Sequence, residues 1–150
     1  MRDEGELREL IRKLLAGQPL AVLATHGEGG AHASLVAFAV TDDLSRLLLA
    51  TPRATRKFEN LASEPRVALL VDNRANRESD FREAAAATVF GSVEEVPEEE
   101  RERSLALYLG RHAHLREFVA SPTTALLRVN VGKYSVVTRF QEVMELRVGS

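Results

Sequence analysis

The chain has 150 residues, no cysteine, no tryptophan, and only 5% aromatic residues. Without cysteine it has no disulfide, no thiolate nucleophile and no cysteine-based metal site, a composition compatible with a reducing cytoplasm. No apolar run approaches the roughly 18 residues that span a bilayer. The N-terminal segment from Met1 to Lys13 is charged throughout, unlike a secretion signal. We therefore expect a cytoplasmic protein without a membrane partner.

The chain also lacks an excess of charge of either sign. It has 20 Lys and Arg against 22 Asp and Glu, a formal net charge of −2. A balance of this kind gives no long-range attraction to nucleic acid, so we expect no nucleic-acid partner, and any basic site has to be local. The length suits a single domain covering residues 1–150.

Motifs of several enzyme classes are missing as well. The sequence has no HExxH, GxGxxG or GxxxxGK[ST] motif and no Ser-His-Asp order. Four histidines are present, His26, His32, His112 and His114, but we predict no metal site. Residues two apart, such as His112 and His114, do not share a helix face, and no carboxylate cluster completes a ligand set. No side chain is assigned as a catalytic acid or base.

The hydrophobic pattern predicts short strands with helices inserted among them. Spacing of three and four residues predicts a helix over residues 4–16, and Asp3 with Glu6 resembles a capping box. The other helices expected are one after Thr55, one after Pro97, and a short piece over 113–118. The expected strands are 20–26, 31–40, 46–50, 66–72, 84–96 with a bulge or close approach at Gly91, 125–131, 134–140 and 143–148.

The order of these elements predicts a mainly β fold with peripheral helices. Several strands are joined by hairpins and there is no βαβ alternation, which favours an antiparallel barrel or sandwich. The small residues Ala33, Ala37 and Ala39 in the second strand are expected to face inward in a tight barrel.

The segment from Thr51 to Lys57 crowds two hydroxyls and three cations between a leucine-rich strand and a predicted helix. A phosphomonoester carries a charge of roughly −1.5 to −2 near neutral pH, and a helix N-terminus offers free N–H groups and a favourable dipole. With Thr55 as N-cap, Arg56 and Lys57 lie in the first turn, where the dipole disfavours cations unless an anion offsets it. The residues thus suggest a phosphate site; a solvated basic turn is the alternative.

Beyond this segment, the chain resembles a known family. The segments Leu20-Ala-Val-Leu-Ala-Thr, Gly30-Ala-His-Ala-Ser-Leu-Val, Leu47-Leu-Leu-Ala-Thr, Thr55-Arg-Lys-Phe-Glu-Asn-Leu and Glu64-Pro-Arg-Val-Ala-Leu-Leu-Val follow the order seen in FMN-binding split barrels of the pyridoxamine 5′-phosphate oxidase-like family. The resemblance runs from about Leu20 to Phe140. It implies a six- to seven-stranded antiparallel split β-barrel of Greek-key type, with the helix over 4–16 as an N-terminal extension.

The resemblance also implies a site and an assembly. The FMN phosphate would be held by Thr55, Arg56 and Lys57 with Thr51 beside them. The flavin ring would lie along Ala33, Ser34, Leu35 and Val36 and contact their main chain. Relatives form homodimers with each flavin between two subunits. Two departures concern polar contacts. The oxidase has an arginine at the start of the flavin-binding strand, whereas in this chain His32 and Ser34 are the only polar candidates there. Ala86 stands where some relatives have a glutamine on the fifth strand.

The function expected from the resemblance is that of an FMN-dependent oxidoreductase acting with a small-molecule reductant or substrate. The alternative is a non-catalytic protein that binds flavin, heme or deazaflavin. Efficient pyridoxamine 5′-phosphate oxidase activity is not expected, because the tryptophan- and arginine-bearing C-terminal segment of that enzyme has no counterpart up to Ser150. His32 is either a flavin contact or an exposed hairpin residue, and residues 72–74 either line the partner's pocket or cap a strand.

Overall fold

The computed structural model describes residues 3–139 and 142–149. Its elements follow the chain in an order close to the prediction. They are α1 (Glu4–Gly17), β1 (Leu20–Gly27), β2 (Gly30–Val40), β3 (Arg46–Pro52), α2 (Arg56–Ser63), β4 (Arg66–Asp72), α3 (Asp80–Glu83), β5 (Ala85–Glu95), α4 (Glu98–Arg111), the 3₁₀ turn η1 (Ala113–Leu115), α5 (Arg116–Ala120), β6 (Thr124–Thr138) and β7 (Glu142–Arg147).

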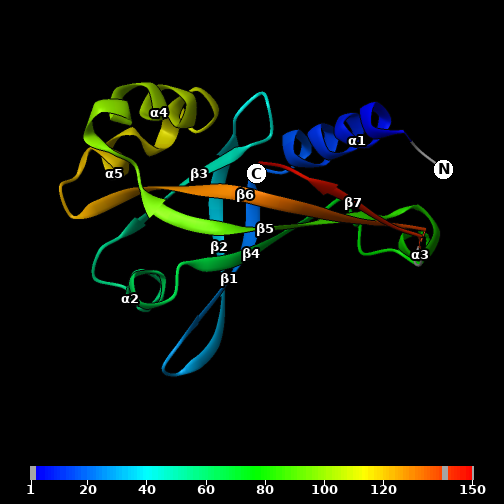
Figure 1. The fold of residues 1–150 in the computed structure, drawn as a ribbon, viewed down its shortest axis with the longest axis horizontal. Coiled ribbons are helices and arrows are strands. Elements are labelled where there is room, and N and C mark those ends of the chain that lie inside the picture. Colours follow the sequence, from blue (N-terminus) through cyan, green and yellow to red (C-terminus); the bar gives the residue numbers. More distant parts are fainter. Residues whose placement is uncertain (1–2, 140–141, 150) are drawn as a thin grey trace.

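The strands form one antiparallel sheet in the order β3-β2-β1-β4-β5-β6-β7, and an additional pairing of β3 with β6 closes the first six strands into a barrel. The strands β1, β2 and β3 follow one another by short turns, and β4 returns through α2 to lie beside β1, which is the Greek-key order. Figure 1 shows α1 on one side of this barrel and α4 with α5 on the other. The predicted split β-barrel is confirmed.

The core has two parts, which explains the sequence of β3. Leu47 and Leu49 face the barrel interior and belong to the main core, whereas Leu48 and Ala50 face outward under α4 with Tyr108. A strand covered on both faces is apolar at successive positions rather than alternate ones. Helix α1 adds Leu7, Ile11, Leu14 and Leu15 to the main core.

Two predictions about β2 and β6 are wrong. All three alanines predicted to face inward face outward: Ala33 is exposed, and Ala37 and Ala39 lie in the smaller core under α4. The inward residues are instead Val36 and Phe38. The predicted break at Gly132 and Lys133 is a bulge, because the pairing of β5 with β6 shifts between Phe90 and Gly91. The strand therefore continues from Thr124 to Thr138. Its predicted end at Phe140 lies outside the described residues.

The prediction for Gly91 is confirmed, since a Cβ at this position would lie 2.4 Å from the main-chain oxygen of Asn130.

The tight turn between β2 and β3 is held by hydrogen bonds rather than by a glycine. Leu44 has a left-handed backbone with φ of 65° and is buried. Asp43 accepts hydrogen bonds from Thr41 and Ser45, and the hydroxyl of Tyr134 donates to the Leu44 oxygen at 2.8 Å. These bonds hold a conformation that leucine rarely adopts.

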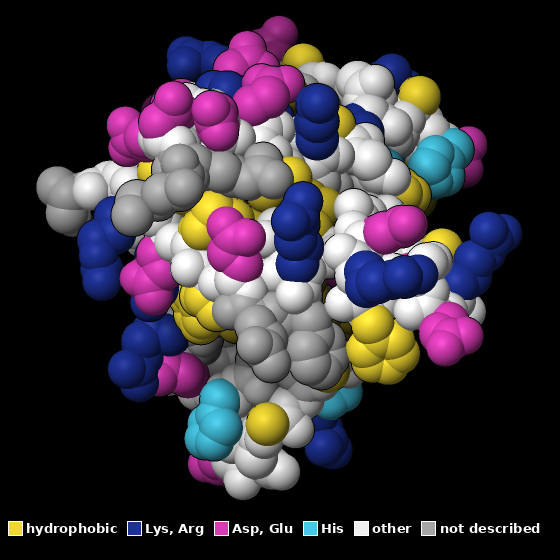
Figure 2. Space-filling model, turned by 90° about the vertical axis from the view of Figure 1, so that its right-hand side faces the viewer, with side chains coloured by type: hydrophobic (Ala, Val, Ile, Leu, Met, Phe, Trp, Pro, Cys, Tyr) yellow, Lys and Arg dark blue, Asp and Glu magenta, His cyan; other side chains and the backbone are white. Residues whose placement is uncertain are grey.

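The surface carries both signs of charge. Figure 2 shows acidic and basic side chains intermixed over one face of the molecule. In the part of the chain that the structure describes, no helix combines the length and the apolar character needed to cross a membrane.

Candidate functional site

The N-terminus of α2 is built as the sequence predicts. Thr55 has an extended backbone and its hydroxyl accepts a hydrogen bond from the Phe58 N–H at 3.0 Å, while its carbonyl accepts from the Glu59 N–H. Thr51, fully buried at the end of β3, has its hydroxyl 3.4 Å from that of Thr55. The N–H groups of Arg56 and Lys57 have no acceptor among the described residues, as expected for the first turn of a helix.

The three cations of this segment have different surroundings. Arg53 forms a two-pronged ion pair with Glu95, with donor–acceptor distances of 3.0 and 2.6 Å, which withdraws it from any phosphate. Arg56 is exposed and Lys57 is half-buried. Neither has a hydrogen bond or an ion pair within the described parts of the chain, and burial lowers the pKa of Lys57. The cations available for an anion are therefore Arg56 and Lys57.

The second predicted part of the site is a strand edge. β2 pairs with β1 along Gly30–Ala37, but with β3 only across Phe38, Ala39 and Val40. From residue 31 to 36 the main-chain groups that point away from β1 therefore have no partner strand, which is the split in the barrel. Backbone N–H and C=O groups are strong and obligatory hydrogen-bonding groups. This edge can bind the polar rim of a planar ring through its main chain.

The side chains of the four predicted strand residues divide between two faces. Val36 is buried in the barrel, and Ser34 points to the same side, where its hydroxyl oxygen is buried without a hydrogen-bond partner among the described residues. Ala33 and Leu35 point outward and are exposed, Leu35 with 65% of its surface. The structure thus presents Ala33 and Leu35 to a ligand or partner from outside, and Ser34 from within.

Leu35 belongs to an apolar row on the outer face of the sheet. Val22 of β1 pairs with Leu35 on one side and with Leu70 of β4 on the other, so the three side chains share a face. A shallow hollow of about 150 Å³ next to them is lined also by Asp72 and Arg74, which form an ion pair at 3.1 Å. Exposed apolar residues in a contiguous group are typical of an interaction surface.

The histidines lie apart. His112 is buried and its Nε2 donates to the Phe38 oxygen at 2.7 Å, with the ring of His114 at 6.2 Å centroid to centroid. His32 is half-buried in β2 near the hairpin, and His26 is exposed on β1. Over residues 3–139 and 142–149, no group of three or more metal-ligating side chains comes together.

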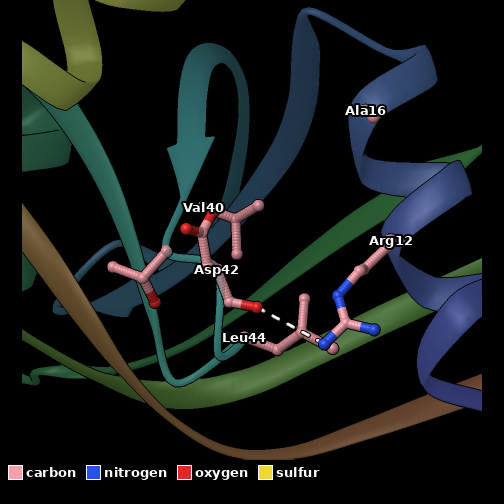
Figure 3. A pocket seen from close by; sticks show the side chains of 6 residues that line it. Arg12, Ala16, Val40, Asp42 and Leu44 are labelled. Atoms are coloured by element: carbon pink, nitrogen blue, oxygen red, sulfur yellow. Dashed lines mark hydrogen bonds between the residues drawn. The ribbon is translucent and has the colours of Figure 1, made fainter. Parts of the chain in front are cut away.

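A separate cavity of about 420 Å³ lies between α1 and the turn after β2. In Figure 3, the guanidinium of Arg12 points from α1 toward this turn and donates to the Asp42 oxygen at 3.4 Å. The other lining residues include Ala16, Val40 and Leu44. The cavity lies at the far end of β2 from the hairpin, so it is not part of the candidate site.

Sequence reasoning missed the buried Asn60 of α2, whose amide lies against β1. The available signal was a polar residue on the helix face that carries Leu61. The sequence predicts a flavin contact along β2 only through the family resemblance, because the residues of one strand do not show which strand pairs with it.

A closed six-stranded antiparallel barrel in which one strand leaves part of its edge unpaired defines the class of split β-barrels. Within that class, the profile of the family described as pyridoxamine 5′-phosphate oxidase matches residues 7–138. The chain belongs to this family. No curated protein sequence matches it significantly.

Solved structures share the fold at low sequence identity. A heme binding protein from Mycobacterium smegmatis is 19% identical with a TM-score of 0.84, and the match covers 98% of this chain and 59% of that one. An FAD-binding protein from Mesorhizobium loti is 19% identical with a TM-score of 0.68, covering 85% and 90%. A general stress protein 26-related protein of the pyridoxinephosphate oxidase family, from Clostridium acetobutylicum, is 16% identical with a TM-score of 0.74, covering 97% of both chains. The chain thus spans 59% of the length of the first of these proteins.

Proposed function

We propose that this protein binds FMN and uses it as an oxidoreductase, with the phosphate at the N-terminus of α2 and the flavin ring along the unpaired edge of β2. The observation that carries the proposal is Lys57, a half-buried ammonium with no ion-pair partner among the described residues, placed in the first turn of a helix. Burying a cation without a partner is unfavourable, and so is placing it at the positive end of a helix dipole. A phosphate dianion at this position removes both costs.

The residues present fit such a ligand. The N–H groups of Arg56 and Lys57 and their two side chains supply donors for the phosphate, and the hydroxyls of Thr51 and Thr55 lie beside them at the end of β3. The main chain of Ala33, Ser34, Leu35 and Val36 would orient the ring. When bound, the flavin supplies the electron or hydride transfer, and the protein contributes binding, orientation and exclusion of water.

A homodimer is part of the proposal. The row of Leu35, Val22 and Leu70 lies on the outer face of the strand assigned to the flavin. A second copy packed against this row would bury the apolar surface and provide a second wall for a planar ring, and twofold symmetry would give two equivalent sites. The other partner is a small-molecule reductant or substrate.

The test compares FMN with riboflavin, which lacks the phosphate, by quenching of flavin fluorescence. A hydrogen bond to a charged group is worth about 1.5–3 kcal/mol, so Lys57→Ala or Arg56→Ala should weaken FMN binding by roughly 10- to 150-fold. Riboflavin affinity should stay nearly unchanged in both variants. Arg103→Ala, which removes an exposed arginine of α4 without a partner among the described residues, is the matched control. Equal affinity of the wild type for FMN and riboflavin would refute the phosphate site.

The absorbance spectrum of the purified protein tests the choice of cofactor. The absorption bands of a flavin are expected. A Soret band would instead indicate heme, which the similar Mycobacterium smegmatis protein binds by its description. A single band, shifted from the positions of the flavin bands, would indicate deazaflavin. Bleaching of the bound flavin by NADH or NADPH supports the oxidoreductase. Absence of bleaching with both reductants would favour a non-catalytic flavin-binding protein.

A further inference from the structure

We propose that Asn60 is a positioning residue that gives the site its selectivity for a phosphate, by seating α2 against two glycines of the β1–β2 hairpin. The inference rests on the proposed phosphate site. Asn60 does not touch the ligand in this proposal. It determines where Arg56 and Lys57 point, and so whether their donors converge on one anion.

The amide of Asn60 is held inside the protein. The residue is 8% exposed, and its Nδ2 donates to the hydroxyl of Thr25, itself buried in β1, at 3.2 Å. A buried amide that loses its partner costs about 1–3 kcal/mol. The bond thus ties this face of α2 to one position along β1.

Gly27 makes this close approach possible. A Cβ built on Gly27 would lie 2.0 Å from the Oδ1 of Asn60 and 2.6 Å from its Cγ, distances at which atoms overlap. Gly27 is not among the residues with positive φ, so its backbone does not call for glycine's conformational freedom. The absence of a side chain is instead needed to make room for Asn60.

Arg56 lies on the same face of α2, because residues four apart on a helix are neighbours. Its Nη1 lies 3.4 Å from the place where a Cβ on Gly29 would be. Asn60 and Arg56 therefore both lie against the β1–β2 hairpin, Asn60 in the space left by Gly27 and Arg56 at an ordinary contact distance from Gly29. A hollow of about 350 Å³ lies between the hairpin turn and this helix, lined by Glu28, Gly29, Arg56, Glu59, Asn60 and Ser63.

The consequence concerns geometry more than stability. Charge-assisted hydrogen bonds require donor–acceptor distances of about 2.7–2.9 Å. A small rotation of α2 displaces the ends of the long Arg56 and Lys57 side chains by more than it displaces the helix itself. A helix that has lost its Asn60 contact keeps both cations but no longer directs them to one point, so phosphate recognition is weakened while ring binding is retained.

The experiment measures the ratio of FMN to riboflavin affinity in the wild type, Asn60→Ala, Gly27→Ala and Thr25→Val, with melting temperatures recorded in parallel. We expect each variant to lower this ratio about tenfold, with riboflavin affinity changed less than about twofold. Thr25→Val keeps the shape of the side chain while removing the acceptor, so it is the mildest variant if Asn60→Ala does not fold. Asn130→Ala is the matched control, because its Nδ2 bonds Glu94 at 2.6 Å, away from α2.

The double variant Gly27→Ala with Asn60→Ala gives a second measurement. The overlap at Gly27 involves chiefly the Oδ1 and Cγ of Asn60, since the Asn60 Cβ is 3.4 Å away. Once Asn60 is truncated, alanine at position 27 should have little further effect, so the two ratio losses should not add. Fully additive losses would overturn the inference.

The outcomes separate the two proposals. If the wild type prefers FMN and the folded Asn60, Gly27 and Thr25 variants keep that preference, positioning by Asn60 is refuted and the phosphate site stands. If melting temperatures fall and both ligands weaken equally, Asn60 serves folding alone and the inference is likewise refuted. If the wild type has no preference for FMN, the proposed phosphate site itself fails, and the inference fails with it.

Discussion

Arg111 is expected to fasten α1 to the barrel, and its removal should release that helix. From the last turn of α4, its Nη2 donates to the main-chain oxygens of Leu15 at 2.7 Å and Ala16 at 3.3 Å and to that of Gln18, and its Nη1 donates to the Phe38 oxygen at 3.2 Å. The last turn of α1 contains no basic residue of its own. Arg111 therefore supplies, from another helix, the cation that stabilises the negative end of α1.

The magnitude follows from the number of bonds that can exist at once. Nη2 carries two hydrogens for three acceptors, so about three effective hydrogen bonds are lost rather than four. The guanidinium also lies 4.7 Å from the centre of the Phe38 ring. The group is partly exposed, and screening by solvent lowers each bond to about 1 kcal/mol, the value of an ordinary hydrogen bond. We expect Arg111→Ala to lower the free energy of unfolding by about 3 kcal/mol, and the melting temperature by about 6–12 °C for a chain of this length.

The assay is a denaturant titration combined with hydrogen exchange of the α1 amides. Protection of α1 should fall more than that of β5 and β6, because the lost contacts are local to the helix end. Arg111→Lys should recover only part of the stability, since an ammonium cannot span the same acceptors. Arg103→Ala is the control and should leave both measurements unchanged. Unchanged stability in Arg111→Ala, or a uniform loss of protection over the whole chain, would refute the reasoning.

Two further predictions concern Asp43 and the outer face of β2. The bonds from Ser45 and Thr41 lower the pKa of Asp43 to about 2 from 3.8. Because the folded pKa lies below the unfolded one, the stabilisation is present above the unfolded pKa and is lost as the pH falls toward 2. In denaturant titrations over that pH range, the difference in unfolding free energy between wild type and Asp43→Ala should shrink. A constant difference would contradict this. Leu35→Glu should convert the proposed dimer to monomer by placing a charge in the apolar row, as measured by sedimentation, with the exposed Leu107→Glu as control. A wild type that is already monomeric with flavin fully bound would contradict the dimer.

Much of the local structure follows from the residues themselves. The strand over residues 66–72 was predicted at its observed bounds, and the N-cap at Thr55 and the close approach at Gly91 were read correctly. These features depend on neighbours in the sequence: hydrophobic alternation, a side chain that bonds its own helix, and a residue without Cβ. The order of motifs also indicated the family, which residues 7–138 confirm.

Features that depend on distant residues could not be read in this way. The outward orientation of Ala37 and Ala39 results from α4, which covers the second face of β2. The continuity of β6 through Gly132 results from its pairing with β5. Arg53 is taken out of the candidate phosphate site by its ion pair with Glu95, 42 positions away. In each case the residue is compatible with two different environments, and its contact with a segment distant in the sequence determines which one it occupies.

The candidate site shows the same division. The sequence alone determined that two threonines and two cations stand at a helix start, because capping and helix direction are local. Only the tertiary structure decided that β2 leaves part of its edge unpaired, and that Asn60 reaches Thr25 over the bare backbone of Gly27. Strand pairing and helix packing are contacts between segments far apart in the chain, and their geometry is set by the shape of both partners together.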